Sequence, residues 1–332
     1  MVKPSSLGDI IHTLPAVEAI HRTAPNAKID WLVNTEWAPL LEGIPFISRV
    51  IPFPRREFRG PMGGWRAWKW AGDRLNRSRY DLALDFQGLC RSALLARSAK
   101  PKHLAGFRQA REGAPFLYDQ KFPVFNWSGR HAVDRNLDLA SAVGANIANP
   151  TFCLPPGDEI PGLNLSGEQT VLLHPFSRGE GKSLSVDEVL ELAKLLRPHT
   201  VVLVGTPPED VPIQWPPFVV DLLGKTTLPQ LIHLIRRCSW TVSVDSGPMH
   251  LAAGITDRVL SLHTWSNPSM VGPWQPDAWI WREGQLLQVK QLSPDQFPER
   301  RDLKASFGSK DRLFSPEEIK AMSDFLIKQL HS

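Results

Sequence analysis

Two polar loops in the second half of this 332-residue chain combine residue types that could bind an anion. They are His174–Ser183 and Val244–Leu251, and each follows a short apolar run and precedes a helical pattern. Ligands of parallel α/β sheets bind where such loops leave the carboxyl ends of the strands. In the first loop Lys182 could neutralise a phosphate near a helix N-terminus, and the alternative is a solvated loop lysine. The Gly-Lys-Ser tail of this loop imitates a P-loop, but that motif requires glycine where the chain has Phe176, which excludes a Walker-type NTPase.

The second loop adds groups that could hold sugar or phosphate oxygens. Backbone N–H groups at Ser246 and Gly247 would open an anion site where the following helix starts. Asp245 and His250 could bind hydroxyl or phosphate oxygens, and the alternative for His250 is a histidine hydrogen-bonded in the core. Two such loops in one domain predict a site for a diphosphate.

A third polar loop, within Lys3–Pro15, leads into a helix that begins near Asp9. The expected helix has its apolar positions at Ile10, Ile11, Leu14, Val17 and Ile20. In the first turn Asp9 could cap the helix or compensate its dipole. The functional alternative is a carboxylate that accepts a proton at the rim of an interdomain cleft. Only two residues precede this loop, fewer than a complete strand before it would need.

The segment Arg49–Arg79 is strongly basic and interleaved with tryptophan. It holds nine Lys and Arg residues against Glu57 and Asp73, with Trp65, Trp68 and Trp70 among them. This composition is typical of surfaces that bind nucleic acid, a phosphorylated glycolipid or an anionic membrane. The alternative is a solvated helix face with a tryptophan anchored in the core.

Composition and charge limit the possible functions. Hydrophobic residues make up 42% and charged residues 22%, which excludes a disordered, collagenous or coiled-coil protein. Residues 1–150 carry 21 Lys and Arg against 13 Asp and Glu, and residues 151–332 carry 17 against 21, so the first half should meet an acidic partner. There is no apolar run of roughly 20 residues, no signal peptide, no Cys-x-x-Cys pair and no Asp-x-Asp. We therefore expect a cytoplasmic protein that needs no metal or other cofactor.

Short apolar runs alternate with helical patterns along the chain, which predicts parallel α/β sheets. The expected strands are Lys28–Val33, Tyr80–Asp85, Thr170–Leu173, Thr200–Val204, Trp240–Val244 and Arg258–Leu262. Capping signals at Ser185 and Ser315 predict helices over Val186–Leu196 and up to Leu330.

The proline-rich run Asn149–Gly167 reads as a linker between two Rossmann-like domains that face each other across a cleft. We expect an N-terminal domain over 1–152 and a C-terminal domain over 153–310. A C-terminal helix over 311–332 follows, and we consider that it packs back on the N-terminal domain.

These motifs together resemble the ADP-heptose:lipopolysaccharide heptosyltransferases of glycosyltransferase family 9. Within that family the resemblance is to the enzymes that add the first heptose to the inner-core Kdo sugar. The matching stretches are Lys3–Pro15, Asp85–Leu89, Gly106-Phe107, Ala110–Glu112, His131–Arg135 and Val244–Leu251. The resemblance implies a GT-B fold with the nucleotide-sugar site in the C-terminal domain, the acceptor site in the N-terminal one, and inverting, metal-independent transfer.

The resemblance also implies roles for individual residues. Asp9 would be the general base, and Lys182 would stabilise the departing ADP. The implied donor-binding residues are Ser177, Lys182, Glu209, Thr226, Asp245, Ser246, Gly247 and His250. The implied acceptor-binding residues are Arg55, Arg56 and Arg59.

The implied partners are ADP-heptose and an anionic, lipid-linked Kdo acceptor at the inner-membrane surface, with no nucleic acid. Two alternatives stay open. One is a related glycosyltransferase with another nucleotide sugar or acceptor, and the other is a nucleic-acid-binding protein that uses residues 49–79.

Overall fold

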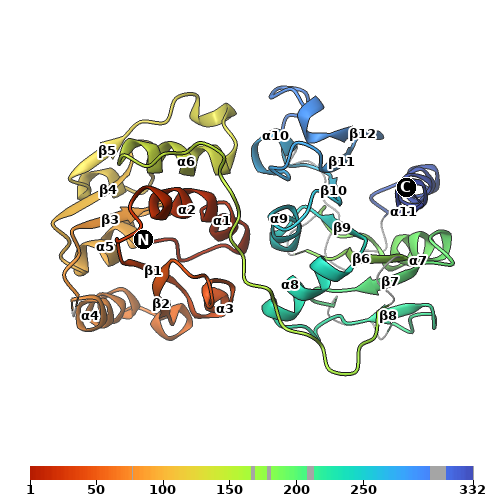
Figure 1. Cartoon of the computed structure of the whole chain (residues 1–332), viewed down its shortest axis with the longest axis horizontal. Coiled ribbons are helices and arrows are strands. Elements are labelled where there is room, and N and C mark those ends of the chain that lie inside the picture. The colour runs from red at the N-terminus through yellow and green to blue at the C-terminus, as the bar shows by residue number, and fades with distance from the viewer. Residues whose placement is uncertain (77, 166–168, 178–180, 208–212, 300–311, 332) are drawn as a thin grey trace. The chain divides into compact units, whose positions relative to one another are not determined.

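The computed structural model describes residues 1–76, 78–165, 169–177, 181–207, 213–299 and 312–331. The chain forms two compact units, Met1–Pro155 and Pro156–Ser332 (Figure 1). The division falls inside the proline-rich run that the sequence marks as a linker, close to the expected boundary after residue 152. The described residues of this run form neither helix nor strand.

The N-terminal unit alternates helices and strands. Its helices are α1 (Leu7–Ile11), α2 (Leu14–Thr23), α3 (Ala38–Leu41), α4 (Gly63–Leu75), α5 (Cys90–Ser98) and α6 (Ala132–Ala142). Its strands are β1 (Ile29–Asn34), β2 (Ile47–Phe53), β3 (Leu82–Asp85), β4 (His103–Phe107) and β5 (Gln120–Phe122).

The first residues of the chain join these strands into one sheet. β1 pairs with β2, and β3, β4 and β5 pair in that order, all in parallel. Val2 bridges the two groups, because it pairs in parallel with both Leu32 and Asp85. The Val2 amide donates to Leu84 O at 2.8 Å, and the Phe86 amide donates to Val2 O at 3.0 Å. The order is therefore β2, β1, the segment at Val2, β3, β4 and β5, with all carboxyl ends at one edge.

The single helix expected after the Lys3 loop is two helices in the structure, α1 and α2. Pro15 has no N–H to continue the helical ladder. In addition, the Thr13 hydroxyl donates to the Asp9 carbonyl oxygen at 2.8 Å, which satisfies one acceptor that a continued helix would use. Both helices still bury their apolar faces, including Ile10, Ile11 and Leu14.

The C-terminal unit is built around a larger sheet. Its strands are β6 (Thr170–His174), β7 (Thr200–Leu203), β8 (Val219–Asp221), β9 (Trp240–Val244), β10 (Val259–His263), β11 (Trp279–Arg282) and β12 (Gln285–Gln288). Its helices are α7 (Val186–Leu195), α8 (Leu228–Arg237), α9 (Gly247–Ala253), α10 (Pro268–Val271) and α11 (Pro316–Leu330). The strand order is β12-β11-β10-β9-β6-β7-β8, and β12 alone among these strands runs antiparallel to its neighbour.

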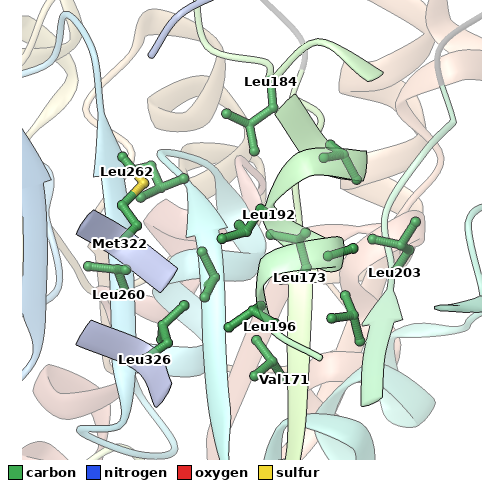
Figure 2. Close-up of a cluster of buried hydrophobic side chains, with 14 of the residues drawn as sticks. Val171, Leu173, Leu184, Leu192, Leu196, Leu203, Leu260, Leu262, Met322 and Leu326 are labelled. Carbon is green, nitrogen blue, oxygen red and sulfur yellow. The ribbon is translucent and has the colours of Figure 1, made fainter. Parts of the chain in front are cut away.

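The last helix belongs to the core of the C-terminal unit. α11 packs against α7, and Met322 and Leu326 lie in one cluster with Leu192, Leu260 and Leu262 (Figure 2). These side chains are almost completely buried. The structure therefore differs from the expected packing of residues 311–332 on the N-terminal domain. The apolar face of α11 is already covered by the sheet and helix of its own unit.

Candidate active site

The two predicted anion loops of the C-terminal unit meet at the centre of its sheet. β6 lies beside β9, with β7 and β8 beyond β6 and β10 and β11 beyond β9. The chain therefore leaves these neighbouring strands in opposite directions, which is the point where open α/β sheets form their ligand crevice. The loops are joined directly, because Lys182 in the first contacts Asp245 in the second.

Lys182 and Asp245 form a largely buried ion pair. The Lys182 Nζ lies 2.7 Å from Asp245 Oδ2 and 3.4 Å from the Asp245 carbonyl oxygen. It also lies 4.3 Å from the centre of the Trp265 ring, a favourable position for a cation. The two charged side chains are 17% and 7% exposed. An ammonium group is thus fixed at the carboxyl edge of the sheet.

The charges around Asp245 keep it ionised. Burial alone would raise the pKa of Asp245, but electrostatic interactions with His263, Lys182 and His250, together with the hydrogen bond from Lys182, lower it to about 2. Asp245 is therefore a carboxylate at neutral pH and a weak proton acceptor. Its function in this arrangement is to balance and orient the lysine.

Two buried imidazoles, His174 and His263, pack beside these loops at the ends of β6 and β10. His174, the last residue of β6, has Nδ1 3.2 Å from both the Ser243 and the Ser246 hydroxyl oxygens. Burial lowers the pKa of His174 to about 4, so its ring is neutral at pH 7. Gly205, with φ of +110°, passes so close that a Cβ there would lie 2.7 Å from the His174 ring. Only glycine fits beside this imidazole, which in turn positions the Ser246 hydroxyl.

His263 occupies the corresponding place at the end of β10. It lies 2.8 Å from the Ser261 hydroxyl and 2.8 Å from the Ser266 hydroxyl. Burial lowers its pKa to about 4. The loop that begins here also carries Trp265, so the packing of His263 helps to fix the ring over Lys182.

The remaining donor candidates lie along the same edge. The Ser177 amide donates to the Ser183 hydroxyl oxygen at 2.9 Å, which closes the loop that carries Lys182. Gly247 and His250 lie on α9, directly after Ser246.

Thr226 lies between β8 and α8, next to Thr227, whose side chain caps α8. The Gly224 amide bonds to Gly205 O at 2.7 Å, which ties the Thr226 loop to the loop after β7. Glu209 lies outside the described residues.

Asp9 in the N-terminal unit caps its own helix. Its Oδ2 accepts hydrogen bonds from the Ser6 amide at 2.9 Å and from the Ser6 hydroxyl at 2.7 Å. Lys3 Nζ lies 3.7 Å from Asp9 Oδ1. The capping interpretation of Asp9 is therefore confirmed, yet its side chain remains 46% exposed. A capped carboxylate that is half open to solvent can still accept a proton from a bound hydroxyl.

The matching stretches of the N-terminal unit gather around the Asp9 loop. The Ser5 amide donates to Gln87 Oε1 at 3.3 Å, and Lys3 Nζ donates to Phe86 O at 2.9 Å. Both partners lie in the loop after β3. The Arg111 amide donates to Gly88 O at 2.8 Å, which adds the loop after β4. Segments far apart in sequence thus build one carboxyl-edge site.

α6 completes this site with a cation. Burial lowers the pKa of Arg135 while the charge of Asp9 raises it, so the two groups interact electrostatically. The Arg135 guanidinium lies 4.8 Å from the centre of the Trp127 ring. Asn136 Nδ2 donates to Thr13 Oγ1 at 3.2 Å, which holds α6 against the turn between α1 and α2. Asp9 therefore lies in a positive environment that contains Lys3 and Arg135.

The three acceptor candidates lie on another part of the same sheet edge. Arg55 and Arg56 are exposed in the short helix η2 (Arg55–Phe58), which follows β2, and Arg59 comes directly after it. Two strand spacings, about 10 Å, separate β2 from the strand segment that leads to Asp9.

The structure thus joins Lys182 and Asp245 directly and assigns Asp9 and the three arginines to the other unit. The position of the Trp265 ring over Lys182 was not predicted from the sequence. A signal was present, because Trp265 comes just after the apolar run that forms β10, the neighbour of β9. Nor was it predicted that His174 orients Ser246, which depends on the pairing of β6 with β9.

The described residues contain neither a membrane-spanning helix nor a cluster of metal-ligating side chains. Within these ranges every helix is too short or too polar to traverse a bilayer. The same residues contain no group of three or more His, Cys, Asp or Glu side chains that could hold a metal ion.

Comparisons with known proteins point to one family. Residues 69–297 match the sequence model of glycosyltransferase family 9 (heptosyltransferase). Lipopolysaccharide heptosyltransferase 1 of Escherichia coli O18:K1:H7 is 28% identical over 336 residues, covering 92% of this chain and 98% of that protein. The Pseudomonas aeruginosa protein of the same name is 40% identical over 148 residues, 42% of this chain and 40% of that protein.

A solved structure agrees with this assignment. The E. coli heptosyltransferase WaaC with ADP superimposes with a TM-score of 0.70 at 26% sequence identity, covering 89% of this chain and 95% of that one. The family match spans well over half of the chain, and the two units are Rossmann-like as in this relative. The chain belongs to glycosyltransferase family 9, the heptosyltransferases, and has their GT-B fold.

Proposed function

We propose that this enzyme transfers heptose from ADP-heptose to a Kdo sugar in the inner core of lipopolysaccharide. The observation that carries the donor half of the proposal is the buried Lys182–Asp245 pair at the switch point of the C-terminal sheet. The WaaC relative has been solved with ADP and with ADP-2-deoxy-2-fluoro heptose. Relatives named lipopolysaccharide heptosyltransferase 1 match most of this chain, which supports the acceptor half.

Lys182 is the proposed partner of the donor diphosphate. An ammonium group has three N–H donors, and among the described residues the two acceptors of Lys182 both belong to Asp245. A diphosphate oxygen could therefore take a hydrogen bond while the ion pair persists. The Ser246 hydroxyl, oriented by His174, and the Gly247 amide would add donors beside it.

The other donor contacts follow from the resemblance to the family. Ser177 would contact the diphosphate, Thr226 the nucleoside and Glu209 the adenosine ribose, and Asp245 and His250 would contribute from the second loop. Each of these assignments is a proposal for mutagenesis.

The chemistry requires a base and a stabilised leaving group. The acceptor hydroxyl oxygen attacks the anomeric carbon of the heptose from the face opposite the diphosphate. A new C–O bond forms as the bond to the phosphate oxygen breaks, and ADP leaves with that electron pair. The hydroxyl proton passes to the Asp9 carboxylate, which is general base catalysis worth about 10²–10⁴-fold. This route inverts the anomeric configuration.

No metal ion takes part in the proposed mechanism. Charge develops on the β-phosphate as the bond to heptose breaks, and a fixed cation at that position stabilises the transition state more than the ground state. In this proposal Lys182 supplies that cation, together with the N–H groups at the start of α9. Transfer should therefore continue in EDTA.

The acceptor is the proposed partner of the N-terminal unit. Kdo carboxylates and lipid A phosphates are anionic, and guanidinium groups bind both as bidentate partners. Arg55, Arg56 and Arg59 would position the acceptor. Because the acceptor is lipid-linked, we propose that the enzyme works in the cytoplasm as a peripheral protein at the inner-membrane surface.

A transfer assay read by mass spectrometry tests the proposal. The purified chain is incubated with Kdo-lipid A and a panel of nucleotide sugars, with and without EDTA. We expect a product heavier by one heptose with ADP-heptose alone, and equal yield in EDTA. Transfer of another sugar would favour a different donor, and loss of activity in EDTA that Mg²⁺ restores would contradict the metal-free route.

A further inference from the structure

The helix α4 presents large apolar side chains to solvent. Met62, which directly precedes it, is 63% exposed, Trp65 is 56% exposed and Trp68 is 58% exposed. They are spaced three residues apart, so they follow one side of the first turns of the helix. Isolated exposed apolar residues are normal, but two tryptophans and a methionine in one patch mark an interaction surface.

These tryptophans are not needed to anchor the helix. α4 is fixed by Gly63, Ala71 and Leu75, which are buried on its other side. Trp70 is half-buried, with its ring 5.2 Å from that of Phe53. A Cβ on Gly63 would lie 1.9 Å from the Phe58 carbonyl oxygen, so α4 packs closely against η2. The sequence alternative of a core-anchored tryptophan therefore describes Trp70 and leaves Trp65 and Trp68 unexplained.

Basic side chains surround the exposed tryptophans. Lys69 Nζ lies 5.8 Å from the centre of the Trp65 ring, and Arg66 Nη2 donates to the Glu57 carbonyl oxygen at 2.7 Å. The exposed basic residues of η2, α4 and the segment between them are Arg55, Arg56, Arg59, Arg66, Lys69 and Arg74, against the exposed acids Glu57 and Asp73. Tryptophan settles at the level of lipid headgroups, and nearby Lys and Arg attract anionic lipids.

We propose that the surface formed by Met62, Trp65, Trp68 and the basic residues of η2 and α4 docks on an anionic phospholipid bilayer. The tryptophan rings enter the headgroup region while the guanidinium and ammonium groups contact lipid phosphates. This inference rests on the proposed function, since it identifies the surface that brings the enzyme to a lipid-linked acceptor. Charge complementarity and the apolar Met62 at the head of the patch favour a bilayer over a nucleic acid, which would use aromatic stacking.

The docking surface begins in the segment that follows the carboxyl end of β2. η2 follows the carboxyl end of β2, and α4 begins after the intervening Arg59–Met62, so the chain enters α4 from the carboxyl edge of the sheet to which the Asp9 segment also belongs. A bilayer bound here would place lipid headgroups beside the edge that holds the proposed base.

Vesicle co-sedimentation of the full chain tests the proposal. We expect partition onto vesicles of phosphatidylcholine with phosphatidylglycerol, weaker partition in high salt, and little onto phosphatidylcholine alone. The variant Trp65→Ala/Trp68→Ala should bind the anionic vesicles roughly tenfold or more weakly. Alanine is the best helix former and both rings are exposed, so the variant should keep its fold, checked by circular dichroism.

Phe116→Ala is the matched control. Phe116 is 89% exposed on the same unit but lies in the short helix η3 (Ala114–Leu117) rather than on α4. Its substitution should leave partition unchanged. Equal losses in both variants, full binding by the double variant, or no partition of the wild type would overturn the proposal. So would retention of RNA or DNA, in place of vesicles, that depends on Trp65 and Trp68.

A transfer measurement separates this proposal from the proposed function. The double variant should keep its rate with a water-soluble acceptor that lacks acyl chains and lose rate only with an acceptor embedded in vesicles. An enzyme that binds anionic vesicles through α4 but transfers no heptose would refute the proposed function and leave the docking surface standing. Normal transfer without any dependence on Trp65 and Trp68 in either assay would refute the docking surface instead.

Discussion

The two units carry an aspartate at equivalent places, and their environments differ sharply. Asp9 and Asp245 both follow a parallel strand at the carboxyl edge of a sheet. Asp9 is 46% exposed, and Lys3 Nζ lies 3.7 Å from its Oδ1. Asp245 is 7% exposed, and its cation, Lys182, is 2.7 Å away. The two aspartates therefore have the same side chain but different surroundings, which suits them to different chemical roles.

This difference assigns the chemistry. A carboxylate whose pKa is about 2 has little affinity for a proton at neutral pH, so Asp245 is a poor general base. Its charge is used to hold Lys182. Asp9 is about half exposed, and its partners include the Ser6 amide and hydroxyl and the more distant Lys3. This difference supports the proposal that the N-terminal unit accepts the proton and the C-terminal unit binds the anion.

The strongest test of this division is Asp9→Asn. We expect transfer to fall about 10²–10⁴-fold, because the amide cannot accept the hydroxyl proton. ADP affinity should stay near normal, because the proposed donor residues all lie in the other unit. Steady-state rates and calorimetric ADP binding measure the two quantities.

Ser6→Ala is the control for the capping role of Asp9. It removes the hydroxyl that donates to Asp9 Oδ2 and should cost about 1 kcal/mol of stability, while the carboxylate remains. Transfer should therefore survive in Ser6→Ala. If the two variants lost activity equally, or if Asp9→Asn turned over normally, Asp9 would be a capping residue alone.

The second test removes the lysine of the Lys182–Asp245 ion pair in the C-terminal unit. Lys182→Ala should lower kcat/KM about 10²–10³-fold and weaken ADP binding, because a preorganised charge on the leaving group is lost. It should also lower the free energy of unfolding by about 3–5 kcal/mol, because Asp245 would be buried without a partner. Chemical denaturation and calorimetry measure these changes.

Lys290→Ala removes the lysine of a similar pair in the same unit and serves as the control. Lys290 and Asp277 are also 2.7 Å apart, but both are about half exposed. Exposed pairs contribute about 0–1 kcal/mol, so this variant should be nearly normal. Unchanged ADP affinity in Lys182→Ala would remove Lys182 from the donor site.

Six strands could be predicted from sequence, whereas the interior strands β4 and β11 and the edge strands could not. β1, β3, β6, β7, β9 and β10 fall within the expected apolar runs or shift by a residue or two at their ends. β2 was missed because Arg49 and Pro52 interrupt its pattern, and its exposed positions need not be apolar. β5 has three residues, too few for any periodicity. Strands buried on both faces often leave a continuous apolar signal, but β4 contains Gly106 and begins with His103, and β11 has only four residues, so both were missed as well.

The loops of the site could be predicted, but their mutual contacts could not. A strand, a polar loop and a helix are local patterns, so His174–Ser183 and Val244–Leu251 were identified. The contact of Lys182 with Asp245 depends on β6 lying beside β9, which is a result of strand order rather than of local sequence. The dual position of Asp9, capped yet half exposed, likewise depends on the packing of α1.

A smaller effect should appear in the pH dependence of stability. His174 titrates near pH 6.5 when unfolded and at about 4 when folded, so only the unfolded chain binds its proton between these values. The contribution of His174 to the free energy of unfolding is therefore fully present above pH 6.5. It falls by about 1.4 kcal/mol per pH unit as the pH drops from there toward 4.

The variant His174→Gln should remove that part of the slope. Urea unfolding at pH 7, 6 and 5 provides the measurement. His103→Gln is the control in the N-terminal unit, because its ring is exposed and substitution removes no buried neutral imidazole. An unchanged slope in His174→Gln would mean that this ring is already charged in the folded protein.

The smallest expected effect concerns the acceptor arginines. Arg55, Arg56 and Arg59 are exposed, so each contact with an anionic acceptor is screened and contributes modestly. Replacing all three with alanine should raise the acceptor KM by roughly tenfold and weaken its dependence on salt. ADP affinity, which depends on the other unit, should not change. The measurement uses a water-soluble acceptor, so that membrane docking does not contribute. If KM and its salt dependence both stayed at the wild-type values, these arginines would have no part in acceptor binding. Lys3 and Arg135, the basic residues near Asp9, would then be the next candidates for acceptor binding.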